Sequence, residues 1–149
     1  NSLNFRIDDI RSAMGLSELN FLKRKNLLRY NVVKRYLRLI KENDLENLIK
    51  IPFKTEIKKS NSHHIFPILL PKNINNSFIF KEMLKNKIQL SMHYPPIHLM
   101  TFYRKKIKLG VVESLHKRLI SLPLYPSLSF NSQIKVIKNL KKIILNYKK

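Results

Sequence analysis

Apolar residues recur at helical spacing over two long stretches, one near each end of the chain. Between Ser17 and Lys41, leucine, valine, isoleucine and tyrosine return every three or four residues, and lysine or arginine fills many of the other positions. Asp8 and Asp9 are typical of a helix start, because their carboxylates complement the free amides of a first turn. We predict a short helix that begins there, followed by a long amphipathic helix over residues 17–41 that is interrupted at Asn26.

The middle of the chain carries two extended patterns. Residues 64–70 form an apolar, β-rich run in which Pro67 favours an edge or a bulge, and residues 88–92 alternate between apolar and polar side chains. The polar, lysine-rich stretch 44–62 is interpreted as a connection with a short strand or turn. A helix between the two extended runs gives the order β-α-β.

Three further helices are predicted after residue 70. The first is capped by Asn76 or Ser77, the second covers residues 111–120, and the third is a terminal amphipathic helix through residues 136–147 with Ser129 as its cap. The apolar stripe of the first consists of Phe80, Met83 and Leu84.

These elements predict an α+β fold, in which a long N-terminal helix is followed by a small layer of a few strands covered on one face by helices. A chain of 149 residues is long enough for one domain with a core. We divide it into a helical arm, residues 1–45, and a small domain, residues 46–149. The length of the arm indicates that it packs on something outside a compact domain, either another part of the same protein or a partner.

Composition narrows the class of protein. A hydrophobic fraction of 44% places the chain among globular proteins although 26% of it is charged. It has no cysteine, which excludes a disulfide framework and a thiolate metal site and fits a reducing compartment. Its apolar runs are far shorter than the roughly 18 residues that cross a bilayer, and residues 1–4 lack a signal-peptide pattern. We expect a soluble, cytoplasmic protein without membrane partners.

The charge is strongly positive. Thirty lysines and arginines against nine acidic residues leave a net charge of +21. Such a field attracts nucleic acid, but the basic residues are dispersed from Arg6 to Lys149 rather than gathered in one arm. We favour a solvated basic surface over a dedicated nucleic-acid face; an anionic small substrate is a third interpretation.

Three segments combine distinctive residue types in a fixed order. Residues 3–16 contain Asn-Phe-Arg, then Asp-Asp-Ile and Gly-Leu. The second segment runs from His-His-Ile-Phe-Pro at 63–67 to His-Tyr-Pro-Pro-Ile-His at 93–98. The third is Leu-Ile-Ser-Leu-Pro-Leu-Tyr-Pro at 119–126. Together they resemble the C-terminal portion of the DegT/DnrJ/EryC/StrS family of pyridoxal-phosphate-dependent nucleotide-sugar aminotransferases.

The resemblance implies the small C-terminal domain of a fold-type-I aminotransferase, an α/β sandwich that a long helix joins to a large cofactor domain. It also implies that Asn4 reaches the cofactor phosphate of the neighbouring subunit in a homodimer. An amide donor suits a phosphate oxygen. From the residues alone, Asn4 is an ordinary cap or turn residue before Asp8.

By the same resemblance, His93, Tyr94 and His98 lie near the entrance of the active site and meet the nucleotide-sugar. The two prolines between them hold this loop extended and lower the entropy lost on binding. A packing loop with satisfied histidines is the alternative. Arg6 is assigned to the substrate as an anion-binding group, or else it braces the turn. We expect no metal site, since the histidine spacing does not match standard ligand patterns.

No segment of the chain resembles the family's cofactor-lysine motif, so we predict no catalytic residue. The family transfers an amino group, from glutamate as we expect, to a keto-sugar in polysaccharide or glycan biosynthesis. On this interpretation the chain is a fragment that supplies substrate-recognition and dimer-partner residues and is inactive alone. Two alternatives remain: a basic nucleic-acid-binding module, and a non-catalytic dimerisation piece.

Overall fold

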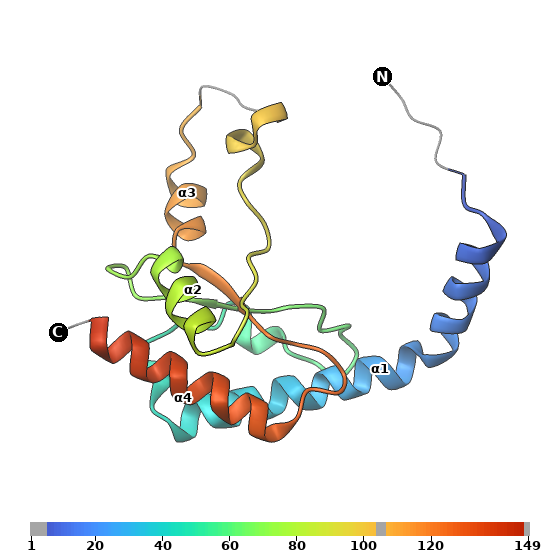
Figure 1. Ribbon diagram of the computed structural model, residues 1–149, viewed down its shortest axis with the longest axis horizontal. Coiled ribbons are helices and arrows are strands. Elements are labelled where there is room, and N and C mark those ends of the chain that lie inside the picture. Colours follow the sequence, from blue (N-terminus) through green and yellow to red (C-terminus); the bar gives the residue numbers. More distant parts are fainter. Residues whose placement is uncertain (1–5, 104–106, 148–149) are drawn as a thin grey trace.

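Helices account for most of the described chain. The computed structural model describes residues 6–103 and 107–147. Its helices and strands, shown in Figure 1, are α1 (Asp9–Glu42), β1 (Phe66–Leu69), α2 (Asn76–Lys85), α3 (Gly110–His116), β2 (Leu119–Leu122) and α4 (Phe130–Tyr147). Four single 3-10 turns complete the described elements: η1 (Leu45–Asn47), η2 (Lys54–Glu56), η3 (Ile97–Leu99) and η4 (Thr101–Tyr103).

α1 is one continuous helix of 34 residues, so the prediction of two helices was wrong. Asp8 caps it by accepting a 2.8 Å hydrogen bond from the Arg11 amide. Asn26 does not interrupt it, because the Asn26 side chain accepts from the Arg29 guanidinium instead of competing for backbone groups. The helix bends in its N-terminal half (Figure 1).

Only the C-terminal half of α1 joins the core. Its buried residues are Val32, Val33, Tyr36, Leu39 and Ile40. The N-terminal half is exposed, including several large apolar side chains: Ile10, Met14, Leu16, Leu19, Phe21 and Leu22. The amphipathic pattern predicted for this helix therefore covers two different environments.

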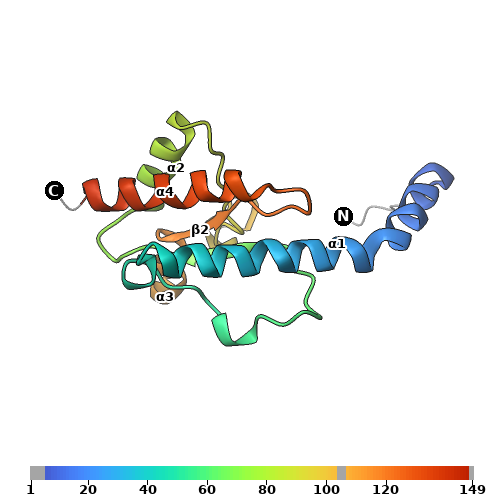
Figure 2. The same cartoon turned by 90° about the horizontal axis from the view of Figure 1, so that it is seen from below.

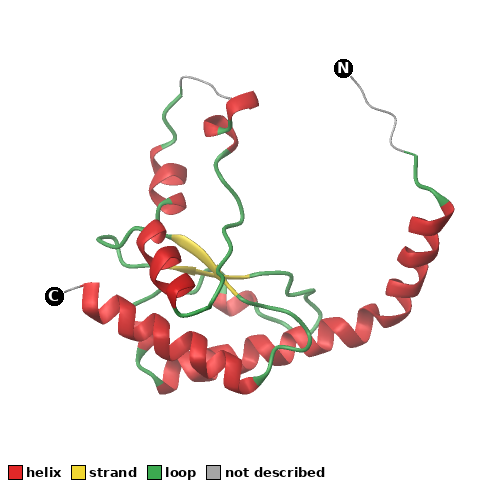
Figure 3. Cartoon of the chain, viewed as in Figure 1, coloured by secondary structure: helices red, strands yellow, loops and turns green. Residues whose placement is uncertain are grey.

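β1 and β2 form a two-stranded antiparallel sheet at the centre of the fold (Figure 3). The register places Phe66 opposite Leu122, and Pro67 opposite Ser121. β1 confirms the strand predicted in residues 64–70. The helix predicted over 111–120 was wrong at its C-terminal end, because Leu119–Leu122 extends to pair with β1.

Residues 88–92 do not form a strand, contrary to the alternation of their side chains. They make a single bridge, between Ser91 and Ser121. Ile88 and Leu90 are nevertheless buried while Gln89 is exposed. The alternating pattern thus predicted burial correctly, but the predicted strand was wrong, because these residues do not form a hydrogen-bonded ladder.

α2 begins one residue earlier than predicted. Its cap is Asn75, whose side chain accepts from the Ser77 amide at 3.0 Å. Met83 is buried as expected, but Ile79 is its core neighbour, whereas Leu84 is 64% exposed. The predicted stripe was therefore rotated around the helix.

A left-handed residue, Lys87 with φ 58°, ends α2. The Lys87 amide donates to the Leu84 carbonyl at 2.8 Å, and the Ile88 amide donates to the Met83 carbonyl at 3.0 Å. These two bonds define a Schellman motif, and buried Ile88 and Met83 supply the apolar residues that accompany it.

α4 packs alongside the buried half of α1, as seen in Figure 2. Its predicted cap is confirmed: the Ser132 amide donates to the Ser129 hydroxyl at 3.1 Å. A fully buried glutamine ties the two helices together, since Gln133 Nε2 donates to the Val32 carbonyl at 2.9 Å. The amphipathic α4 closes one side of the core.

The core lies between the sheet and the helices α1, α2 and α4. Tyr36 of α1 stacks on Phe66 of β1, with ring centroids 5.2 Å apart, and donates its hydroxyl to the Pro123 carbonyl at 2.9 Å. Burial raises the pKa of Tyr36 well above its usual value. The α+β class with a long N-terminal helix is confirmed, and the division at residue 45 stays a prediction.

A helix that crosses a bilayer must be both long and apolar. Among residues 6–103 and 107–147, no helix meets both requirements.

Candidate functional site

The chain from His93 to Tyr103 rises away from the sheet beside α3 (Figure 1). Pro95 and Pro96 begin it, and the single turns η3 and η4 follow. The His93–Tyr94 peptide bond is cis. Two consecutive prolines restrict the backbone before η3, so this segment presents its side chains with little conformational freedom.

This segment and α3 enclose an open cavity of about 800 Å³. Its described wall is aromatic and aliphatic, and the polar side chains among the described lining residues are one imidazole and two phenol groups. The lining residues are Tyr94, Pro95, Pro96, Ile97, His98, Phe102, Tyr103, Leu109 and Val112. Several of them are largely exposed, with Phe102 at 90% and Tyr94 at 70%. Such a surface has the apolar character and the few polar groups of a ligand site.

His98 is the buried polar residue of this wall. Its side chain is 7% exposed, and Nε2 lies 3.1 Å from Oε1 of Glu113 in α3. The same carboxylate oxygen accepts from the Leu109 amide at 3.0 Å. The hydrogen bond from Leu109 and then that with His98 lower the pKa of the Glu113 carboxyl.

His93 has a supporting position. It is not among the residues that line the cavity; its Nδ1 lies 3.0 Å from the hydroxyl of buried Ser121 in β2. Its ring packs edge-on against Tyr94, with centroids 5.0 Å apart at 89°. His93 thus connects the sheet to an aromatic residue of the cavity.

Of the two remaining predicted site residues, Arg6 and Asn4, the structure describes only Arg6. Arg6 is exposed and precedes α1, whose start is well separated from the 93–103 segment in Figure 1. Asn4 lies outside the described residues. The structure therefore brings together His93, Tyr94 and His98, but it does not place Arg6 with them.

The described residues of this cavity do not by themselves fit a pyridoxal phosphate site. Covalent attachment of the cofactor needs a lysine, and its chemistry needs a carboxylate near the pyridine nitrogen. Neither a lysine nor a carboxylate is among the described residues that line the cavity. The same described ranges, 6–103 and 107–147, bring no three metal-ligating side chains into one group.

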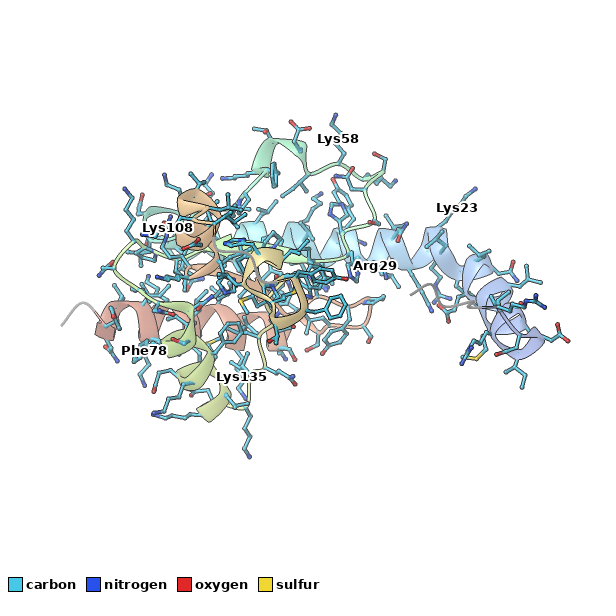
Figure 4. The ribbon with its side chains drawn as sticks, turned by 90° about the horizontal axis from the view of Figure 1, so that it is seen from above. Lys23, Arg29, Lys58, Phe78, Lys108 and Lys135 are labelled. Atoms are coloured by element: carbon cyan, nitrogen blue, oxygen red, sulfur yellow. The ribbon has the colours of Figure 1, made fainter. Side chains whose placement is uncertain are left out.

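The positive charge is spread over separate parts of the surface. Figure 4 shows Lys23 on α1, Lys58 in the loop before β1, Lys108 before α3 and Lys135 on α4. All four side chains are exposed. The solvated basic surface favoured from the sequence stays a prediction.

Glu113 and Ser121 were not predicted as site residues. Glu113 lies 15 positions after His98, a separation without a local signal. Its place in the first turn of a helix favours a carboxylate for capping alone. Ser121 is the polar residue of an apolar run. That pattern indicates a buried hydroxyl, which needs a hydrogen-bond partner.

The family comparison covers nearly the whole chain. A model described as the DegT/DnrJ/EryC1/StrS aminotransferase family matches residues 2–141. This match confirms the resemblance drawn from the three segments.

Individual relatives are 28% and 30% identical to the chain over the aligned residues. A Methanocaldococcus jannaschii protein, "Uncharacterized protein MJ1066", is 30% identical over 94% of this chain and 37% of its own length. The UDP-4-amino-4,6-dideoxy-N-acetyl-beta-L-altrosamine transaminase of Campylobacter jejuni is 28% identical over 85% of this chain and 34% of its own.

A solved structure gives the same picture. Helicobacter pylori PseC, an aminotransferase involved in the biosynthesis of pseudoaminic acid, superposes with a TM-score of 0.82 at 26% identity. The match covers 97% of this chain and 39% of that one. The chain thus spans a little over a third of the length of these relatives.

Proposed function

Because this chain belongs to the DegT/DnrJ/EryC1/StrS aminotransferase family, we propose that it is the C-terminal portion of an enzyme that aminates a nucleotide-linked keto-sugar. Glutamate is the proposed amino donor. The chain's share of its relatives, 37% and 34% of their lengths, supports a portion rather than a whole enzyme. Its role in the enzyme is recognition of the substrate.

The observation that carries this proposal is the aromatic cavity beside α3. Tyr94 and Tyr103 offer ring faces and hydroxyl groups, and His98 offers a ring nitrogen. Aromatic faces stack on a nucleobase or a sugar ring, while the polar groups fix its orientation. The prolines at 95 and 96 reduce the entropy lost when a ligand binds. Arg6 would approach the substrate from another direction.

Pyridoxal phosphate is the proposed cofactor of the longer protein, where it supplies the electron sink for amino transfer. Asn4 would donate its amide to the cofactor phosphate of a neighbouring subunit in a homodimer. The apolar side chains exposed on the N-terminal half of α1 support a covering surface beyond this chain. On this proposal residues 1–45 join the cofactor domain to the small domain 46–149.

The test begins with the longest in-frame protein that contains this chain. Incubated with glutamate, pyridoxal phosphate and UDP- or dTDP-linked keto-sugars, it should form 2-oxoglutarate and an amino sugar, measured by mass spectrometry. Absence of a cofactor-lysine segment upstream, or no amino sugar from any of these substrates, would contradict the proposal.

Variants link the activity to this chain. Tyr94→Ala should raise KM for the sugar more than it lowers kcat, because it removes a contact made in binding. Tyr125→Ala is the matched control, since Tyr125 is 48% exposed and lies outside the cavity. An equal effect of the two substitutions would argue against recognition by the cavity.

A further inference from the structure

The carboxylate of Glu113 contacts the buried imidazole of His98, which lines the cavity. Glu113 Oε1 lies 3.1 Å from His98 Nε2 and also accepts from the Leu109 amide at 3.0 Å. Glu113 itself does not line the cavity, whereas His98 does. The carboxylate therefore contacts the imidazole from outside the space that a ligand would occupy.

The carboxylate is fixed from the α3 side. Within the described part of the chain, no side chain caps α3 at Leu109. Glu113, one turn into the helix, reaches back to the Leu109 amide instead and satisfies one of the free amides of this helix end. A carboxylate with this second bond has little freedom to leave His98, so the ring orientation is set by the fold before any ligand arrives.

The hydrogen-bond roles follow from the chemistry of the two groups. An ionised carboxylate only accepts, so a neutral His98 must carry its proton on Nε2 to bond with Glu113. The other ring nitrogen, Nδ1, is then an acceptor. Among residues 6–103 and 107–147 no hydrogen-bond partner is found for Nδ1.

We propose that Glu113 is a positioning residue that holds His98 as the Nε2–H tautomer, so that Nδ1 accepts a hydrogen bond from a ligand in the cavity. The ligand group is a donor: a sugar hydroxyl or an amide N–H. The phosphodiester oxygens of a nucleotide-sugar are excluded as the partner, because they carry no proton at neutral pH and can only accept. The tautomer of His98 is inferred from the structure alone. The identity of the ligand as a nucleotide-sugar rests on the proposed function.

The tautomer can be measured without any ligand. Long-range ¹H–¹⁵N correlation spectra of the ¹⁵N-labelled chain at neutral pH distinguish Nδ1–H, Nε2–H and doubly protonated rings. His98→Gln assigns the resonances of His98 among those of the five histidines. We expect the Nε2–H pattern in the wild type and a mixture of tautomers in Glu113→Ala. Glu82→Ala is the matched control, because Glu82 is a helical glutamate paired with Lys85 at 2.7 Å in α2.

The outcomes separate this inference from the proposed function. An Nδ1–H or doubly protonated ring in the wild type would overturn it, as would an unchanged His98 pattern in folded Glu113→Ala. If Glu113→Ala does not fold, the inference is tested by the wild-type tautomer and by the isosteric Glu113→Gln variant. The glutamine amide can donate to the His98 ring as well as accept from it, so this variant should shift the balance between the two tautomers of His98.

Titration with UDP-N-acetylglucosamine tests the ligand class. It should shift the His98 Nδ1 resonance, whereas dimethyl phosphate, a phosphodiester that carries no proton at neutral pH, should not. A shift of the same size with dimethyl phosphate would overturn the donor assignment. An Nε2–H ring that responds to neither probe would support the positioning role of Glu113 and count against the proposed sugar site.

Discussion

Replacing Lys87 with glycine should stabilise the chain. Lys87 occupies the left-handed region at φ 58°, where the side chain of an L-residue crowds the following carbonyl. That conformation costs a non-glycine residue roughly 1–2 kcal/mol. Glycine removes this cost but loses more backbone entropy on folding, about 0.5–1 kcal/mol. The difference is a gain of about 0.5–1 kcal/mol, or an increase in Tm of about 1–4 °C for a chain of this size.

Urea unfolding followed by far-ultraviolet circular dichroism measures the change. Lys85→Gly is the matched control, because Lys85 has helical geometry in the last turn of α2 and should lose up to about 1 kcal/mol. Asn86→Gly tests the neighbouring position, whose φ is −87° and whose side chain donates to the Glu82 carbonyl at 2.9 Å. It should not stabilise. The reasoning is refuted if Lys87→Gly destabilises the chain as much as Lys85→Gly does.

Three further perturbations follow from the packing and the site. Tyr36→Phe should lower the free energy of unfolding by about 1–2 kcal/mol in urea titrations, because the Pro123 carbonyl loses its buried donor; Tyr125→Phe, on the surface, should change little. Asn76→Ala should lower the free energy of unfolding by about 1–3 kcal/mol in the same assay, because Asn76 Nδ2 donates to the carbonyls of His116 and Leu119 at 2.7 and 3.1 Å. An effect no larger than that of Asn73→Ala, at an exposed position, would contradict this account. The lowered pKa of Glu113 adds stability that is present above the ordinary carboxyl pKa of 4.5 and is lost as the pH falls through the pKa of the folded state. Glu113→Gln should therefore lose less stability than the wild type when both are titrated with acid below pH 4.5. Parallel stability curves for the two proteins would refute this account.

Patterns that depend on near neighbours in the chain were predictable. The capped start at Asp8, strand β1 and the Ser129 cap of α4 each rest on residues within a few positions of one another. The resemblance of three short segments was also sufficient to predict the family and the α+β class.

Features set by distant pairing were not predictable. Leu119 continues the apolar spacing of α3, and only its partner Leu69 on β1 decides that this stretch is extended. Residues 88–92 show the opposite case, since their alternation is that of a strand but only Ser91 finds a bridging partner. The pairing of His98 with Glu113 likewise depends on where α3 stands beside the cavity.

The sequence predicted only part of the site, because the contacts of its side chains also depend on residues distant in the chain. The His-Tyr-Pro-Pro-Ile-His segment identified Tyr94 and His98, which line the cavity. The sequence gives no sign that His93 would turn to Ser121 of the sheet instead. Roles that depend on which edge of a ring faces a neighbour require the three-dimensional arrangement.

The continuity of α1 has a mechanical consequence. The bond from Gln133 to the Val32 carbonyl and the packing of Tyr36 clamp one half of the helix, while the other half projects beyond the core. From Val32 to Asp9 the helix extends about 35 Å at 1.5 Å per residue. A tilt of about 5° at the clamped half would displace the free tip by about 3 Å over that length. A rigid α1 would therefore convert a small rotation of the domain into a displacement of ångströms at its far end.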